Sequence, residues 1–200
     1  MIKEEIILAS SSERRSRILY ESGIRHRVVP ADVEETKDSS RHISETVVIN
    51  AVMKAEAVAA LHADAVVIGA DTLIVHGKDI IGKPADEKEA FETLKRFSGS
   101  RIEVFTGLSV IRSSAGKKAE GFEKSALNIT ALTEERIKRY FKLLVPYDKA
   151  GGFSIEGIGS LIFDDIEGSY FNILGLPMTR LSTLFTQTKL DILDYVSTNP

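Results

Sequence analysis

Hydrophobic residues recur with a helical period in several segments of the chain. Between Ser44 and His62, valine and alanine residues form one apolar stripe, which predicts an amphipathic helix. A shorter helix is predicted from Ser12 to Ser22, where Gly23 ends it. Capping and stop residues predict three more helices, from Asp86 to Gly99, from Thr133 to just before Pro146, and from Pro177 onward.

Strand-sized hydrophobic runs lie between these helices. Glu5 to Ala9 and Ala65 to Ala70 are typical of buried strands. Leu73 to Val75 continues the second run toward a turn, and Ile80-Ile81 then predicts a strand that pairs back as a hairpin. The remaining predicted extended segments are Ile102 to Arg112, Gly121 to Thr130 and Leu161 to Phe163.

Helices that alternate with hairpins and crossover strands predict an α/β protein with a mixed β-sheet. No repeat, low-complexity segment or flexible linker divides the chain. We therefore expect residues 1–200 to form a single domain.

The composition excludes several classes of protein. A chain of 200 residues with 43% hydrophobic content can fill a core, and its hydrophobic runs are too short to cross a membrane. The chain has no cysteine, which favours a reducing cytoplasm. A net charge of −3 argues against a nucleic-acid partner, whereas the early cluster of arginines suits a small anionic ligand.

Asp71 is a candidate catalytic or metal-binding carboxylate. It follows the buried run Ala65 to Ala70, and we expect it near the end of that strand, where α/β sheets hold their ligands. Gly69 predicts a close approach by another backbone or by a ligand. A rigidly held carboxylate can hold Mg²⁺ or activate water, although capping the following turn is an alternative role.

The segment Ser10-Ser11-Ser12 is a candidate anion site, because a strand there leads into a helix N-terminus with free N–H groups. Arg14 and Arg15 are unusual in a first helical turn, where the helix dipole disfavours cations, and a bound phosphate would explain them. An ordinary serine N-cap with solvated arginines is the alternative.

Two lysines lie where they could reach an anion. Lys54 falls at the edge of an apolar stripe, so its stem can be buried while its ammonium points along the core boundary. Lys83 lies in an extended Gly-Lys-Pro segment. Glu35 could supply a second metal-binding carboxylate, and the glycine-rich stretch Gly151 to Gly159 could face a base or a ribose.

Taken in order, these segments resemble the Maf family, the septum-formation Maf-like proteins. The family start L-A-S-x-S-P-R-R is matched by Leu8 to Arg15, with Glu13 in place of proline. Further matches are Glu34-Glu35-Thr36, Lys54-Ala55, Gly69 to Thr72, Gly82 to Pro84, Thr106-Gly107, Ala150 to Gly157 with Glu156 in place of glutamine, Gly168 to Tyr170, and Gly175 to Pro177.

The resemblance implies an elongated central sheet with two lobes and a cleft, similar to the inosine-triphosphate pyrophosphatases. It implies hydrolysis of a nucleoside triphosphate to a monophosphate and pyrophosphate with Mg²⁺ or Mn²⁺, and a possible homodimer. The implied roles are Asp71 as the general base, Glu35 and Asp71 as metal ligands, Ser10, Ser12, Arg15, Lys54 and Lys83 as triphosphate ligands, and Arg14, Thr72 and Glu156 as residues that select the substrate.

Three functions remain open at this point. Arg14 and Thr72 resemble the subfamily that prefers dTTP and UTP, whereas Glu156 resembles the subfamily that acts on 7-methyl-GTP. The third alternative is a nucleotide-binding regulator of cell division without turnover.

Overall fold

The computed structural model describes residues 3–36, 41–143 and 153–197. Its strands form a seven-stranded sheet in the order β2-β1-β3-β5-β6-β7, with β4 paired to β3. Parallel pairs join β1 to β2 and to β3, and antiparallel pairs join β3 to β4 and β6 to β7. The predicted class, an α/β protein with a mixed sheet flanked by helices, is confirmed.

The chain divides into two compact units. Unit one contains residues 1–72, 106–123 and 174–200, and unit two contains residues 73–105 and 124–173. One family of residues, 1–200, remains our expectation for the domain, and the two units are described separately below.

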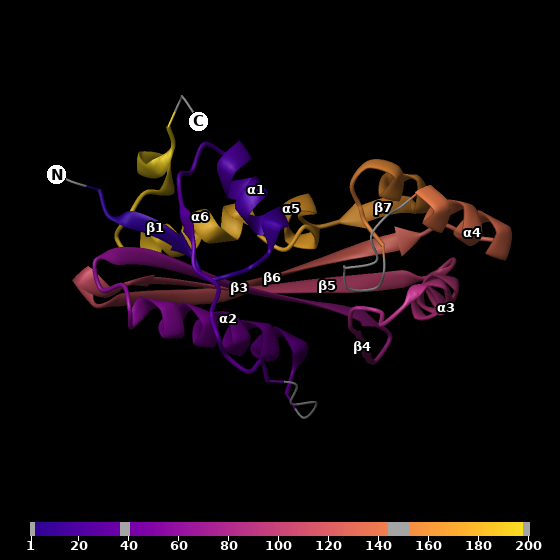
Figure 1. The fold of residues 1–200 in the computed structure, drawn as a ribbon, viewed down its shortest axis with the longest axis horizontal. Coiled ribbons are helices and arrows are strands. Elements are labelled where there is room, and N and C mark those ends of the chain that lie inside the picture. The colour runs from indigo at the N-terminus through magenta and orange to yellow at the C-terminus, as the bar shows by residue number, and fades with distance from the viewer. Residues whose placement is uncertain (1–2, 37–40, 144–152, 198–200) are drawn as a thin grey trace. The chain divides into compact units, whose positions relative to one another are not determined.

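Unit one contains the first part of the sheet and three long helices. Its strands are β1 (Glu5–Leu8), β2 (Arg27–Val28) and the beginning of β3 (Ala65–His76), and it also holds parts of β5 (Arg101–Arg112) and β6 (Lys117–Ile129). Helix α2 (Ile43–Ala59) covers one face, and α1 (Glu13–Glu21) and α6 (Met178–Gln187) lie on the other (Figure 1). A short helix, η1 (Ser113–Ala115), joins β5 to β6, and η4 (Ile192–Tyr195) follows α6.

Local signals in the sequence account for the helices of unit one. The side chain of Ser12 accepts a hydrogen bond from the backbone of Arg15 as the N-cap of α1, and Gly23 has a φ of +74° just after the helix. The apolar stripe of α2 packs on the sheet, where its alanines and Val58 join a core with Ile7 and Val67. Both helix predictions are therefore confirmed.

Two glycines let α2 lie unusually close to the sheet. A Cβ atom on Gly69 of β3 would lie 2.1 Å from the carbonyl oxygen of Ala51. A Cβ on Gly107 of β5 would lie 2.1 Å from the carbonyl oxygen of Val47. Any larger side chain at either position would force the helix away from the sheet. The prediction that another backbone approaches Gly69 is thus confirmed, and the backbone is that of α2.

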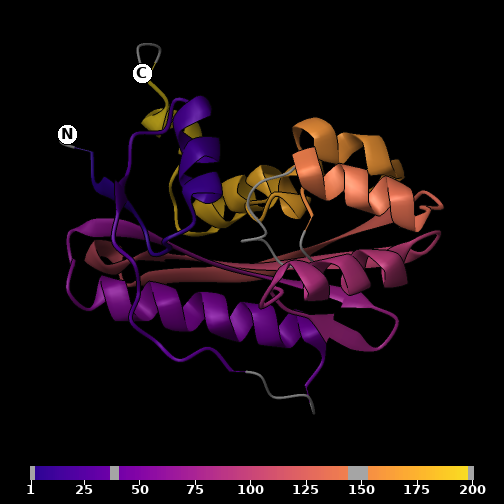
Figure 2. The same cartoon turned by 45° about the vertical axis from the view of Figure 1, so that its right-hand side comes forward.

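Unit two contains β4 (Asp79–Ile81), α3 (Glu87–Phe97), α4 (Glu134–Leu143), η3 (Gly157–Ile162), β7 (Phe163–Glu167) and α5 (Tyr170–Ile173). Helices α3 and α4 contact each other (Figure 2). Asp86 caps α3 by accepting from the backbone of Glu89 at 2.8 Å, and Thr133 accepts from the backbone of Arg136 at the start of α4. The predicted hairpin and both predicted caps are confirmed.

Two predictions about extended segments are wrong. The strand predicted over Leu161 to Phe163 is the end of η3, and β7 begins only at Phe163. The chain turns tightly there, because Gly157 has a φ of +57° and a Cβ on Gly159 would lie 1.6 Å from the carbonyl oxygen of Ser154. Asp71 was expected near a strand end, yet β3 continues to His76 and places Asp71 within the strand. The predicted helix stop before Pro146 and residues 150–152 of the glycine-rich stretch lie outside the described residues.

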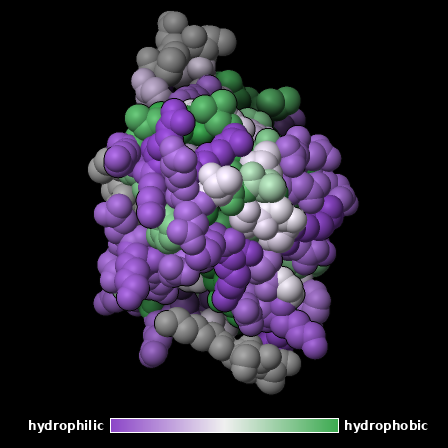
Figure 3. Space-filling model, turned by 90° about the vertical axis from the view of Figure 1, so that its right-hand side faces the viewer, coloured by the Kyte–Doolittle hydropathy of each residue, from purple (hydrophilic) through white to green (hydrophobic). Residues whose placement is uncertain are grey.

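The surface seen in Figure 3 is mainly hydrophilic, with hydrophobic side chains in smaller groups among the charged ones. Among the described residues, none of the helices combines the length and the hydrophobicity that crossing a membrane requires.

We predict that Gly69→Ala lowers the free energy of unfolding by at least about 1–3 kcal/mol, because the new methyl group would overlap the backbone of α2. Gly121→Ala is the matched control, since its Cβ would meet only side-chain atoms at 3.6 Å or more. Urea unfolding of both variants measures the difference. Equal stability of the two variants would contradict the close approach of α2.

Candidate functional site

The candidate site of unit one begins where β1 ends. Strand β1 pairs with β3 up to Leu8, which lies opposite Ile68, and the backbone of Ala9 donates a last hydrogen bond to the carbonyl of Ile68 at 2.8 Å. Strand β3 continues beyond this point and carries Asp71 and Thr72 past the end of its parallel neighbour. Residues on β3 after Ile68 therefore have side chains and loops beside them instead of β1.

Asp71 is a buried carboxylate with a donor on each oxygen. Its residue exposure is 5%. The ammonium of Lys54 lies 2.8 Å from Oδ1, and the side-chain amide of Asn50 donates to Oδ2 at 3.0 Å. Two donors fix the plane of the carboxylate, and each oxygen retains a lone pair that can accept a hydrogen bond from water.

Lys54 joins two carboxylates. Its Nζ lies 2.6 Å from Oε1 of Glu35 and 2.8 Å from Oδ1 of Asp71. The side chain of Lys54 is only 12% exposed, as expected for a lysine at the edge of an apolar stripe, while that of Glu35 is 47% exposed. The structure thus brings together three of the predicted residues, with the ammonium between the two acidic groups.

Asn50 is a site residue that the sequence analysis missed. It lies one helical turn before Lys54 on α2, so both side chains reach Asp71 from the same helix face. Asn50 also accepts from the backbone N–H of Thr36 at 2.8 Å and donates to its carbonyl at 3.3 Å. A polar residue inside an apolar stripe, four positions before a candidate lysine, was the signal that could have identified it.

The serines after β1 bind the chain itself. Ser12 caps α1, and the hydroxyl of Ser10 accepts from the backbone N–H of Ser12 at 3.3 Å. The N-cap alternative for Ser12 is therefore present in the structure. A role for Ser10 and Ser12 in anion binding stays a prediction.

Arg15 is buried and Arg14 beside it is half-buried. The guanidinium of Arg15 donates to Ser10 and Thr72 and to two backbone carbonyls. Burial lowers the pKa of Arg15 below the ordinary arginine value, Asp71 and Glu35 oppose this change, and the charge of Arg14 adds to it. Two cations and two carboxylates thus influence one another in this region of unit one.

Lys83 and Glu156 belong to unit two, and the contacts described above do not include them. Lys83 is exposed in the segment after β4, as the Gly-Lys-Pro sequence predicts. Glu156 is half-buried, and its backbone N–H donates to the hydroxyl of Ser154 at 3.1 Å. Their proposed contacts with a substrate stay predictions.

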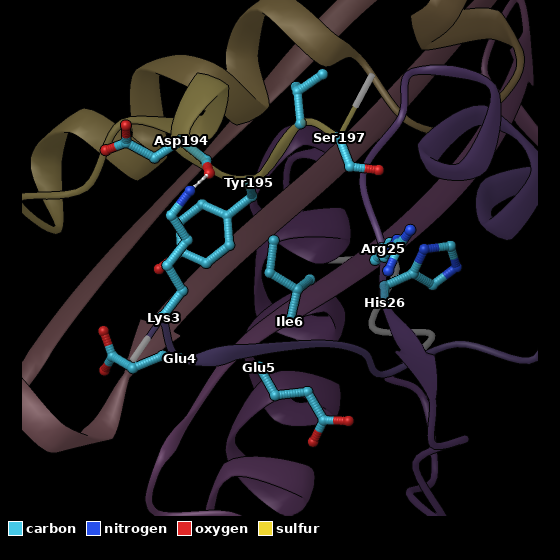
Figure 4. Close-up of a pocket in the computed structure, with 10 residues that line it drawn as sticks. Lys3, Glu4, Glu5, Ile6, Arg25, His26, Asp194, Tyr195 and Ser197 are labelled. Carbon is cyan, nitrogen blue, oxygen red and sulfur yellow. Dashed lines mark hydrogen bonds between the residues drawn. The ribbon is translucent and has the colours of Figure 1, made fainter. Parts of the chain in front are cut away.

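A separate cavity of about 410 Å³ lies in unit one beside the first residues of β1. Figure 4 shows Lys3, Glu4, Glu5 and Ile6 facing Tyr195 across it, with Lys3 bound to the carbonyl of Asp194. None of the predicted site residues is among those that line it. It is therefore distinct from the site around Asp71.

The fold and this cluster of charged groups define a mixed-sheet α/β protein with a buried, oriented carboxylate. The family model described as Maf-like protein matches residues 5–188, so the chain belongs to the Maf-like protein family. The predicted family is thus confirmed.

Curated relatives match almost the whole chain. A dTTP/UTP pyrophosphatase of Caldicellulosiruptor saccharolyticus is 38% identical over 194 residues, which cover 95% of this chain and 98% of that protein. A dTTP/UTP pyrophosphatase of Dictyoglomus thermophilum is 39% identical over 193 residues, which cover 96% of this chain and all of that protein. Among solved structures, the Staphylococcus aureus Ham1 protein is 18% identical, with a TM-score of 0.44 and coverage of 64% of this chain and 72% of that one.

We predict that Asn50→Asp destabilises the protein by about 1–3 kcal/mol, because it replaces a donor to Asp71 with a second carboxylate. The double variant Asn50→Asp, Asp71→Asn exchanges donor and acceptor and should recover part of that loss. Urea unfolding of the two single variants and the double variant tests the pair as a cycle. Additive losses would show that Asn50 and Asp71 do not interact.

Proposed function

We propose that this protein hydrolyses nucleoside triphosphates to nucleoside monophosphates and pyrophosphate, with dTTP and UTP as the preferred substrates. The observation that carries the proposal is the carboxylate of Asp71, buried and held by Lys54 and Asn50. The printed names of the relatives, dTTP/UTP pyrophosphatases that match nearly the whole chain, support the same activity and substrates.

Asp71 would act as the general base. A water that donates a hydrogen bond to its carboxylate attacks one of the two phosphorus atoms that flank the α–β bridge. The new P–O bond forms as the bridging P–O bond breaks, the bond's electron pair leaves with the bridging oxygen, and the water's proton passes to Asp71. Lys54 keeps the carboxylate oriented, and positive groups offset the charge that develops on the phosphoryl oxygens.

Glu35 and Asp71 fit a divalent metal ion. Their oxygens converge on the same point, within 2.8 Å of the Lys54 nitrogen, and carboxylate oxygens are the ligands that Mg²⁺ and Mn²⁺ prefer. When bound there, the ion would polarise the phosphoryl oxygens and screen their charge. Lys54 occupies the same position as a cation, so we expect the ammonium to compete with the metal.

The remaining predicted residues keep the roles that the family resemblance implies, as proposals. Ser10, Ser12 and Lys83 would contact the triphosphate, and Arg14, Thr72 and Glu156 would select the base. A homodimer and a cytoplasmic location also stay predictions.

Release of pyrophosphate from dTTP, UTP, CTP, ITP and 7-methyl-GTP, with Mg²⁺ or Mn²⁺, tests the function. We expect selective turnover of dTTP and UTP and a loss of at least about 100-fold in Asp71→Asn. Nucleotide binding without turnover, unaffected by Asp71→Asn, would instead favour a binding-only regulator. Preferred turnover of 7-methyl-GTP would assign Glu156 the decisive role in substrate choice.

We predict that Lys54→Met binds Mn²⁺ more tightly than the wild type in the absence of nucleotide, because the competing ammonium is gone. The same variant should turn over substrate about 100-fold to 1,000-fold more slowly, since it loses a charged group at the reacting centre. Electron paramagnetic resonance of free Mn²⁺ measures the binding. Lys54→Met combined with Asp71→Asn is the control and should lose the gain. Unchanged Mn²⁺ affinity in Lys54→Met would contradict the competition.

A further inference from the structure

Arg15 makes more contacts inside unit one than a phosphate ligand could spare. Its Nε donates to the carbonyl of Gly175 at 2.8 Å, and its second terminal nitrogen donates to Oγ1 of Thr72 at 2.9 Å. Its first terminal nitrogen donates both to Oγ of Ser10 at 2.9 Å and to the carbonyl of Ala70 at 3.0 Å. Four hydrogen bonds to neutral protein oxygens therefore use most of its donors.

A guanidinium has five N–H donors, and strong phosphate recognition uses two of them in parallel. To bind a phosphate in that way, Arg15 would have to release at least one oxygen that it now holds. Three of its four hydrogen bonds are buried, and the residue is only 9% exposed. A buried acceptor left without its donor is costly, so these contacts favour a role inside the protein.

The partners of Arg15 surround the catalytic carboxylate. Ala70 and Thr72 are the chain neighbours of Asp71 on β3, and Arg15 holds one group from each of them. Ser10 follows β1, and Gly175 precedes α6. One side chain thus fixes the strand on both sides of Asp71 relative to two other segments of unit one.

The hydroxyl of Thr72 is oriented from two sides. Arg15 donates to its oxygen, and Oγ1 of the fully buried Thr106 lies 3.0 Å from the same atom. Two fixed partners leave this hydroxyl one remaining hydrogen-bonding direction for a ligand. A hydroxyl constrained in this way can distinguish a base that offers a donor from a base that offers an acceptor.

We propose that Arg15 is a positioning residue that orients the hydroxyl of Thr72 for nucleotide selection, and that it does not bind the triphosphate directly. The inference rests on the proposed function, in which Thr72 takes part in substrate choice. It replaces the phosphate-binding role that the family resemblance implies for Arg15.

A double-mutant cycle of Arg15→Lys and Thr72→Val tests the inference, with kcat/KM for dTTP and CTP measured for each variant. Lysine keeps the positive charge but lacks the fork that reaches Thr72. Loss of this oriented hydrogen bond should lower the dTTP-to-CTP preference about tenfold in each single variant. The double variant should lose no more than either one. Arg17→Lys is the matched control on the same helix, because Arg17 is exposed and pairs only loosely with Glu21 at 3.8 Å.

Binding of inorganic triphosphate, measured by calorimetry, separates the two roles of Arg15 without using turnover. We expect Arg15→Lys to bind inorganic triphosphate as the wild type does. Weaker binding of inorganic triphosphate, or multiplied losses of preference in the double variant, would overturn the inference. If the wild type releases no pyrophosphate, the proposed function fails, and the affinities of dTTP and CTP still report the preference in the cycle.

Gly175→Ala provides a second way to disturb the same contact if Arg15→Lys does not fold. Its Cβ would lie 3.1 Å from Oγ1 of Thr72 and 3.5 Å from Nε of Arg15, at a φ of +94°. We expect this variant to lose dTTP-to-CTP preference and to retain the binding of inorganic triphosphate. Retained preference would contradict the role of the Arg15–Thr72 contact.

Discussion

The close approach of α2 to the sheet is the constraint on which the candidate site depends. Backbone carbonyls of α2 fill the space that side chains at Gly69 and Gly107 would occupy. Lys54 and Asn50 project from the same helix and reach Asp71, which lies two residues after Gly69 on β3. A helix held farther away would leave a buried carboxylate without donors, so the packing of the core and the electrostatics of the site have one cause.

Charge balance explains why this arrangement is stable without a ligand. The ammonium of Lys54 contacts both Glu35 and Asp71, and the charge of Arg15 is close enough to both carboxylates for them to raise its pKa. Two cations therefore face two anions in a region where an isolated charge would be expensive. An added divalent ion or an added phosphate would disturb this balance in opposite directions, which is consistent with a substrate that binds together with a metal.

Local signals predicted most of the fold, whereas contacts between distant segments limited the prediction of the site. Caps such as Ser12 and Asp86 and the stripe of α2 act over a few residues, so the sequence is sufficient to predict them. The strand at Leu161 to Phe163 failed because a tight turn around Gly159 depends on its contact with Ser154. Asp71 and Lys54 were predictable from residue type and stripe position, but nothing local indicates that Arg15 reaches Gly175, 160 positions away.

The two adjacent arginines of α1 illustrate why a motif does not assign one role to all of its letters. Successive residues of a helix point about 100° apart, so Arg14 and Arg15 cannot face the same ligand in the same way. Arg15 points into unit one, where protein oxygens take up its donors, and Arg14 remains half-buried. A cation in the first turn is unfavourable for the helix dipole, and for Arg15 the compensation comes from the protein's own carbonyls, hydroxyls and carboxylates. The conflict that seemed to require a bound phosphate is therefore resolved, for this residue, within the fold itself.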